Sequence, residues 1–73
     1  MSWSTNPAVF DYKMFRHWRL KQGLRQEDVA HYCHVSINTI SSIEVGTFTP
    51  RLNLYFMLCK CIGVPFGSFL KSE

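Results

Sequence analysis

Glycine and proline residues divide this chain into short segments, and that division limits what it can fold into. Gly23, Gly46 and Gly63 each follow a run of apolar side chains with helical spacing, and Pro50 disfavours a helical Thr49. Glycine ends a helix readily because it adopts the left-handed conformation after the last turn without steric cost. The expected helices are Tyr12–Gln22, Gln26–Cys33, Ile37–Val45, about Leu52–Ile62, and a shorter one from Pro65 or Phe66 to Leu70.

Capping residues support these boundaries. Asp11 and Ser36 stand just before two of the helices, where a side-chain oxygen can accept from the free amides of the first turn. Glu27 and Asp28 lie in the first turn of another, where carboxylates favour the positive end of the helix dipole. The side chains expected to face inward include Phe15, Trp18, Val29, Ala30, Cys33, Ile40 and Ile43. Since no strand pattern is visible, the sequence predicts a compact all-α fold of five helices.

Size and charge narrow the class of protein. The 73 residues suffice for one domain, which we divide into an N-terminal arm (1–10) and a helical domain (11–73). Five short helices supply few walls for a catalytic cleft, so we expect no enzyme, no cofactor and no small-molecule substrate. A net charge of +3 favours a polyanionic partner, though only slightly.

The cysteines and the chain start indicate the compartment. Cys33, Cys59 and Cys61 form an odd set, and residues 1–10 lack the pattern of a signal peptide. No apolar stretch approaches about 18 residues, so no membrane segment is expected. Cys59 and Cys61 lie about 200° apart around a helix and cannot share one metal ion. We therefore expect a cytoplasmic protein with reduced thiols and no metal, with a redox role for Cys61 left open.

The segment from Phe15 to Leu70, about three quarters of the chain, resembles the phage-repressor and Cro type of helix-turn-helix domain, the XRE family. The resemblance depends on the joint order and spacing of several short motifs. They are Trp18-Arg19, Gly23-Leu24, Gln26 to Ala30, Val35-Ser36, Thr39 to Gly46, Pro50 and Gly63-Val64. It implies a lambda-repressor-like fold whose helix-turn-helix unit runs from Gln26 to Val45 and binds double-stranded DNA.

The resemblance also implies which side chains contact DNA. The base-reading positions fall on Ile37, Asn38 and Ser42, with Ser41 nearby, on a helix that enters the major groove. Asn38 is the strongest candidate because its amide can form two hydrogen bonds with adenine. The alternative is a solvated polar residue in a first helical turn. The phosphate candidates are Gln26, Arg25, Thr39, Thr47, Thr49 and Arg51.

Several features depart from or qualify the family pattern. Arg25 replaces the usual serine or threonine cap, and His34 replaces the usual glycine of the turn, where a positive φ is expected. The Ile37–Val45 helix carries no Lys or Arg, so charge for phosphates must come from Lys13, Arg16, Lys21, Arg25 and Arg51. The resemblance implies that Arg19 and Glu44 form a mostly buried, structural ion pair.

The Leu52–Ile62 helix is unusually apolar. The family pattern assigns Leu52, Tyr55, Leu58, Cys59 and Ile62 to the core, which leaves other apolar side chains without burial. We expect these to form a homodimer or partner interface consisting of Leu54, Phe56, Met57, Cys61, Phe66, Phe69 and Leu70. The alternative is that the arm covers this surface through Trp3 and Phe10.

Two functions are compatible with the sequence. The first is a transcriptional regulator, expected to be a repressor, that binds a two-fold operator as a homodimer. The second is a protein-interaction module of the same fold, such as an antitoxin that binds a partner protein. The behaviour of the purified chain separates them, since only the first predicts a homodimer that shifts specific duplex DNA.

Overall fold

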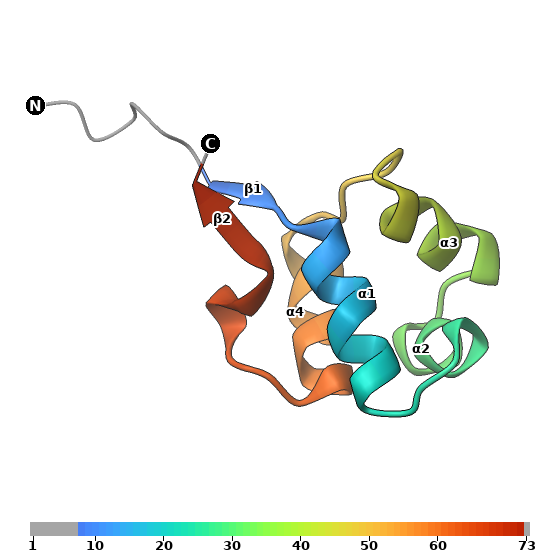
Figure 1. The fold of residues 1–73 in the computed structure, drawn as a ribbon. Helices are drawn as coiled ribbons and strands as arrows, with labels where there is room; N and C mark the ends of the chain where they lie inside the picture. The colour runs from blue at the N-terminus through green and yellow to red at the C-terminus, as the bar shows by residue number, and fades with distance from the viewer. Residues whose placement is uncertain (1–7, 73) are drawn as a thin grey trace, which may run out of the picture.

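The computed structural model describes residues 8–72 and is mostly helical (Figure 1). Within that range the elements are β1 (Ala8–Phe10), α1 (Tyr12–Lys21), α2 (Gln26–Cys33), α3 (Ile37–Val45), α4 (Leu52–Ile62), the 3-10 helix η1 (Phe66–Phe69) and β2 (Leu70–Ser72). Helix α2 packs against both α3 and α4, while α1 packs against α3 and η1. None of the described helices has the length and apolarity needed to cross a membrane.

The helix boundaries follow the predictions from the sequence closely. Helices α2, α3 and α4 begin and end at the predicted residues, and α1 ends one residue early, at Lys21. The Asp11 carboxylate accepts from the amide of Met14 at 3.1 Å, and the Ser36 hydroxyl accepts from the amide of Thr39 at 3.2 Å. Both predicted N-caps are thus confirmed. Local signals were sufficient here because capping needs only residues three positions apart.

The prediction of five helices and no strands is wrong at the ends of the domain. The expected fifth α-helix is the 3-10 turn η1, and the backbone at Leu70 is already extended. Strands β1 and β2 then pair antiparallel, with Ala8 opposite Ser72 and Phe10 opposite Leu70. Residues 8–10, expected in the N-terminal arm, are thus part of the folded unit, while Trp3 lies outside the described residues.

Four aromatic rings join these ends to the core. Phe10 contacts Phe15, Tyr55 and Phe69, with ring centroids 5.9 to 6.2 Å apart, and Phe15 lies 5.4 Å from Phe69. Most of these pairs are edge-to-face, the arrangement that aromatic quadrupoles favour. The remaining core is made of aliphatic and small side chains from α2, α3 and α4: Val29, Ala30, Cys33, Ile40, Ile43, Leu58, Cys59 and Ile62.

Two predictions about apolar residues near α4 are wrong. Leu52, assigned to the core, is 73% exposed, and Phe69, assigned to an interface, is fully buried. Leu52 begins α4 beyond the reach of the core, and the buried residue at that end is Pro50. Phe69 turns inward because η1 carries it over Phe15. The predicted interface residues Leu54, Met57 and Cys61 are half-buried and pack against the core of their own subunit.

The end of α3 is held in close contact with the start of α1. Gly46 has φ +86°, and a Cβ atom built there would lie 2.8 Å from the ring of Tyr12. Gly63 has the same φ of +86°, but a Cβ atom there would meet nothing within 4 Å. The two glycines therefore share a backbone requirement and differ only in packing.

We predict that Gly46→Ala destabilises the domain more than Gly63→Ala. Both substitutions incur the left-handed backbone strain, about 1–2 kcal/mol. Gly46→Ala adds a steric overlap with Tyr12, typically about 1–3 kcal/mol. Urea unfolding of both variants measures the difference. A Tyr12→Ala background should abolish it, and equal losses in the two variants would contradict the contact.

Candidate nucleic-acid interface

The first turn of α3 exposes one apolar and one polar side chain to solvent. Ile37 and Asn38 are exposed, and Ser41 and Ser42 lie one turn further along the same side, half-buried. The opposite side of α3 is committed to the core through Ile40 and Ile43. The structure therefore brings the four predicted base-reading residues together on one face. All four are uncharged, so direct readout from α3 would depend on amide, hydroxyl and methyl contacts.

A tight turn fixes the angle between α2 and α3. His34 has φ +58° and ψ +41°, which confirms the positive φ expected at the position where the family usually has glycine. The amide of Val35 donates to the Ala30 carbonyl at 3.0 Å and closes the turn. Ala30 is buried where the two helices meet. A non-glycine residue in this conformation costs stability, though histidine tolerates it better than branched residues.

Five of the six predicted phosphate-contacting residues lie at two places, and the sixth, Thr39, lies within α3. Arg25 and Gln26 begin α2, while Thr47, Thr49 and Arg51 follow α3 along the loop to α4. Thr47 is oriented by its hydroxyl, which donates to the Ser42 carbonyl at 3.2 Å. Thr49 and Arg51 are exposed on either side of the buried Pro50.

Thr39 and Arg25 have intramolecular partners. The hydroxyl of Thr39 shares a hydrogen bond with the Ser36 hydroxyl at 3.0 Å. The guanidinium of Arg25 lies 3.6 Å from the Glu27 carboxylate, an exposed pair worth little. The cap lost at Arg25 is replaced in part by Asp28, whose carboxylate accepts from the Arg25 amide at 2.8 Å.

Arg19 and Glu44 are in direct contact and buried. The Arg19 Nε donates to Glu44 Oε2, and its Nη2 donates to Oε1 at 3.0 Å. Its third donor group reaches the Leu24 carbonyl at 2.7 Å. This bidentate arrangement joins α1 to α3 and also fixes the connection into α2.

Two further side chains approach the same carboxylate. Gln26 Nε2 donates to Glu44 Oε1 at 3.1 Å, and Arg16 Nε lies 3.9 Å from that oxygen. This convergence on Glu44 was not predicted from the sequence. The spacing of three residues between Arg16 and Arg19 was the available signal, because such pairs share one helix face.

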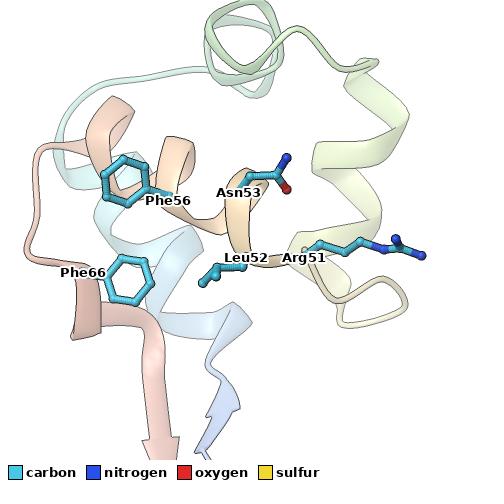
Figure 2. Close-up of a pocket in the computed structure, with 5 residues that line it drawn as sticks. All are labelled: Arg51, Leu52, Asn53, Phe56 and Phe66. Carbon is cyan, nitrogen blue, oxygen red and sulfur yellow. The ribbon is translucent and has the colours of Figure 1, made fainter.

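An apolar patch (Leu52, Phe56, Phe66 and Leu70) is exposed on α4, η1 and β2. Part of it lines a shallow hollow of about 620 Å³ together with Arg51 and Asn53 (Figure 2). The Phe56 and Phe66 rings lie 5.9 Å apart, with Leu52 beside them and the Arg51 guanidinium directed away. A smaller hollow shares Leu52 and extends to Leu70, so the patch is continuous.

The three thiols lie in apolar surroundings. Burial raises the pKa of the Cys33 thiol to about 11, and burial also raises the pKa values of Cys59 and Cys61. A raised pKa lowers the thiolate fraction and with it the reactivity. These directions speak against a redox role for Cys61. No group of three metal-ligating side chains is found in residues 8–72.

Two short helices joined by a tight turn, the second with an exposed polar face, define the class of helix-turn-helix proteins. A family model described as helix-turn-helix matches residues 15–69. The chain therefore belongs to this family, of the XRE or Cro/C1 type, as the motifs predicted. It is a DNA-binding transcriptional regulator and not an enzyme.

Relatives and solved structures agree with this assignment. The chain is 41% identical over 49 residues to an uncharacterised HTH-type transcriptional regulator of Methanocaldococcus jannaschii, covering 67% of this chain and 74% of that protein. It is 34% identical over 58 residues to the cryptic phage CTXphi transcriptional repressor RstR of Vibrio cholerae, covering 80% of this chain and 52% of the repressor.

The fold matches solved regulators at low identity. The restriction-modification controller protein C.AhdI from Aeromonas hydrophila superposes with a TM-score of 0.75 at 19% identity, over 80% of this chain and 88% of that one. A hypothetical transcription factor, NHTF from Neisseria, gives a TM-score of 0.76 at 21% identity, over 85% and 71%. Both likenesses support the lambda-repressor-like fold.

We predict that Arg19→Met destabilises the domain by about 3–5 kcal/mol, because it leaves the Glu44 carboxylate buried without its main partner. Thermal unfolding by circular dichroism measures the loss. The double variant Arg19→Met, Glu44→Leu should recover most of the stability, because neither charge then remains in the core. A single variant as stable as the double variant would contradict the buried pair.

Proposed function

We propose that this protein is a repressor that binds a two-fold DNA operator as a homodimer, with α3 of each subunit in the major groove. The observation that carries the proposal is the exposed first turn of α3, together with the candidate phosphate-contacting side chains at the start of α2 and in the loop after α3. Ile37 and Asn38 project from that turn. Contacts from these two segments to the DNA backbone would position α3 on the duplex without reading its sequence.

Base readout in this arrangement depends on Asn38. Its amide nitrogen can donate to adenine N7 while its carbonyl oxygen accepts from the adenine N6 amino group. This pair of hydrogen bonds makes Asn38 the most selective side chain on this face. Ile37 suits a thymine methyl group, and the hydroxyls of Ser41 and Ser42 accept many base edges. We therefore expect one well-specified base pair in each half-site and weaker preferences around it.

Phosphate contacts supply affinity without selectivity. Gln26 at the start of α2, with Arg25 beside it, would bind one phosphate near the positive end of the helix dipole. Thr47, Thr49 and Arg51 would bind phosphates on the other side of α3, and Thr39 is a further candidate. Because α3 itself carries no Lys or Arg, each subunit alone binds weakly, and two linked subunits are needed.

The apolar patch supports pairing of two subunits. Phe56 is 49% exposed and Phe66 43% exposed, and their rings lie 5.9 Å apart, so they form one apolar surface. A shared surface of two copies would remove these rings from water. Phe69 drops out of the proposed interface because it is buried, and Leu52 joins it. The half-buried Leu54, Met57 and Cys61 stay as candidates at its margin.

A second function rests on the same patch. If a different protein covered Phe56 and Phe66, the domain would act as an interaction module, as in an antitoxin bound to its partner. The name of the Vibrio relative, a phage transcriptional repressor, favours the first proposal. The oligomeric state of the purified chain separates the two.

Selection of bound duplexes from a random pool tests the operator. We predict a palindromic consensus for the wild type, and for Asn38→Ala a loss of preference at one position in each half-site worth about 1–3 kcal/mol. Thr49→Ala is the matched control, since loss of a phosphate contact should weaken all sequences equally. An equal loss of affinity for all duplex sequences with Asn38→Ala would contradict base readout by that residue.

We predict that Phe56→Ser weakens the dimer by about 2 kcal/mol or more, as expected for a central aromatic side chain. Sedimentation equilibrium measures the dissociation constant. Phe48→Ser is the control, because Phe48 is 44% exposed but lies in the loop outside the patch. A wild type that is monomeric while binding a palindromic duplex, or equal effects of both variants, would contradict the proposed interface.

A further inference from the structure

The cluster around Glu44 holds more positive than negative charge. One carboxylate is shared by two guanidinium groups, those of Arg19 and Arg16. Arg19 neutralises Glu44, since it makes two hydrogen bonds to it and is itself buried. The positive charge of Arg16 is therefore not balanced by the Glu44 carboxylate. Its side chain is 59% exposed, while that of Glu44 is 2% exposed, so the surplus charge lies at the surface.

Gln26 reaches the same carboxylate oxygen from the start of α2. Its Nε2 lies 3.1 Å from Glu44 Oε1, and Arg16 Nε lies 3.9 Å from that atom. The two side chains therefore meet over one buried oxygen, although they come from different helices. The hydrogen bond to Glu44 also orients the amide of Gln26, because only its nitrogen end can donate there.

We infer that Arg16 and Gln26 together bind one DNA backbone phosphate, with Glu44 as the positioning residue beneath them. The inference rests on the proposed function and names the residue that supplies the charge. A phosphate oxygen above the pair would accept from the free guanidinium nitrogens of Arg16 and from the outer N–H of Gln26. Its negative charge would balance the surplus charge of the cluster. Arginine suits this role because it presents several donors in a rigid plane.

Other basic residues of α1 are directed elsewhere. Lys21 Nζ lies over the Trp18 ring, 5.0 Å from its centroid. Lys13 lines a hollow with Asp11 and Lys71, on the side of α1 that faces β2. Among the described basic side chains of α1, Arg16 is the exposed one that reaches the same Glu44 oxygen as Gln26. It was one of five basic residues that the sequence left open as a source of charge.

The arrangement couples binding of the DNA backbone phosphate to the position of α3, the proposed recognition helix. Glu44 belongs to α3, so the atom that orients Gln26 and Arg16 moves with the helix that carries Asn38. A phosphate bound at this point would therefore set the depth and rotation of α3 in the groove. This is a positioning role, and it differs from the structural role of the Arg19–Glu44 pair.

Binding to a non-specific duplex at several salt concentrations tests the inference. The slope of log K against log salt counts the phosphates contacted, at about 0.9 for each contact. We expect Arg16→Gln to reduce the slope by about 0.9 for each bound subunit and to weaken binding about eightfold per subunit at 0.1 M salt. Arg16→Lys should keep most of the slope. Lys13→Gln, which removes the same charge from the other side of α1, should change it little.

Two comparisons make the result decisive. In combination with Gln26→Ala, the loss from Arg16→Gln should be smaller than alone, because both residues serve one phosphate. A slope for Arg16→Gln equal to the wild-type slope, with only the melting temperature lowered, would overturn the inference and leave a structural role. Equal slope changes in the Arg16 and Lys13 variants would overturn it as well. A flat wild-type plot would instead overturn the proposed function itself.

Discussion

The buried pair between Arg19 and Glu44 is the contact on which the geometry of the interface depends. It joins α1 to the last turn of α3, and through the Leu24 carbonyl it fixes the chain where it enters α2. A buried ion pair is a weak source of net stability, because the cost of removing both charges from water offsets most of the attraction. Its contribution here is to fix the relative orientation of α1 and α3. Five donors in a rigid plane leave few orientations of one helix against the other.

The core around that pair is thin, and aromatic residues close it. Phe10 and Phe69 come from opposite ends of the chain and meet beside Phe15 and Tyr55. Tyr55 also donates its hydroxyl to the Phe66 carbonyl, and burial raises its pKa to about 12. The connection after α4 is therefore fixed from inside the domain. As a result, Phe66 stays at the surface next to Phe56, which gives the apolar patch its shape.

The sequence predicted the elements that depend on neighbours a few residues apart. Ser36 and Gly46 mark both ends of α3, and His34 signals an unusual turn, because each acts within one turn of backbone. The antiparallel ribbon escaped prediction since three-residue strands show no period. Leu52 was misassigned because the family pattern places a core residue at this position, whereas here the side chain lies beyond the edge of the core. The position of Arg16 relative to Gln26 depends on how three helices pack, which no local pattern contains.

The ribbon of β1 and β2 has a consequence for how this domain can be built into larger proteins. Ala8 lies opposite Ser72, so the two ends of the described chain leave the domain side by side (Figure 1). They do so on the side away from α3. A short linker could therefore join the ends and the chain could be opened in a loop elsewhere, since neighbouring termini favour circular permutation. For the same reason the whole unit could be inserted into a loop of a host protein with its recognition helix still facing outward.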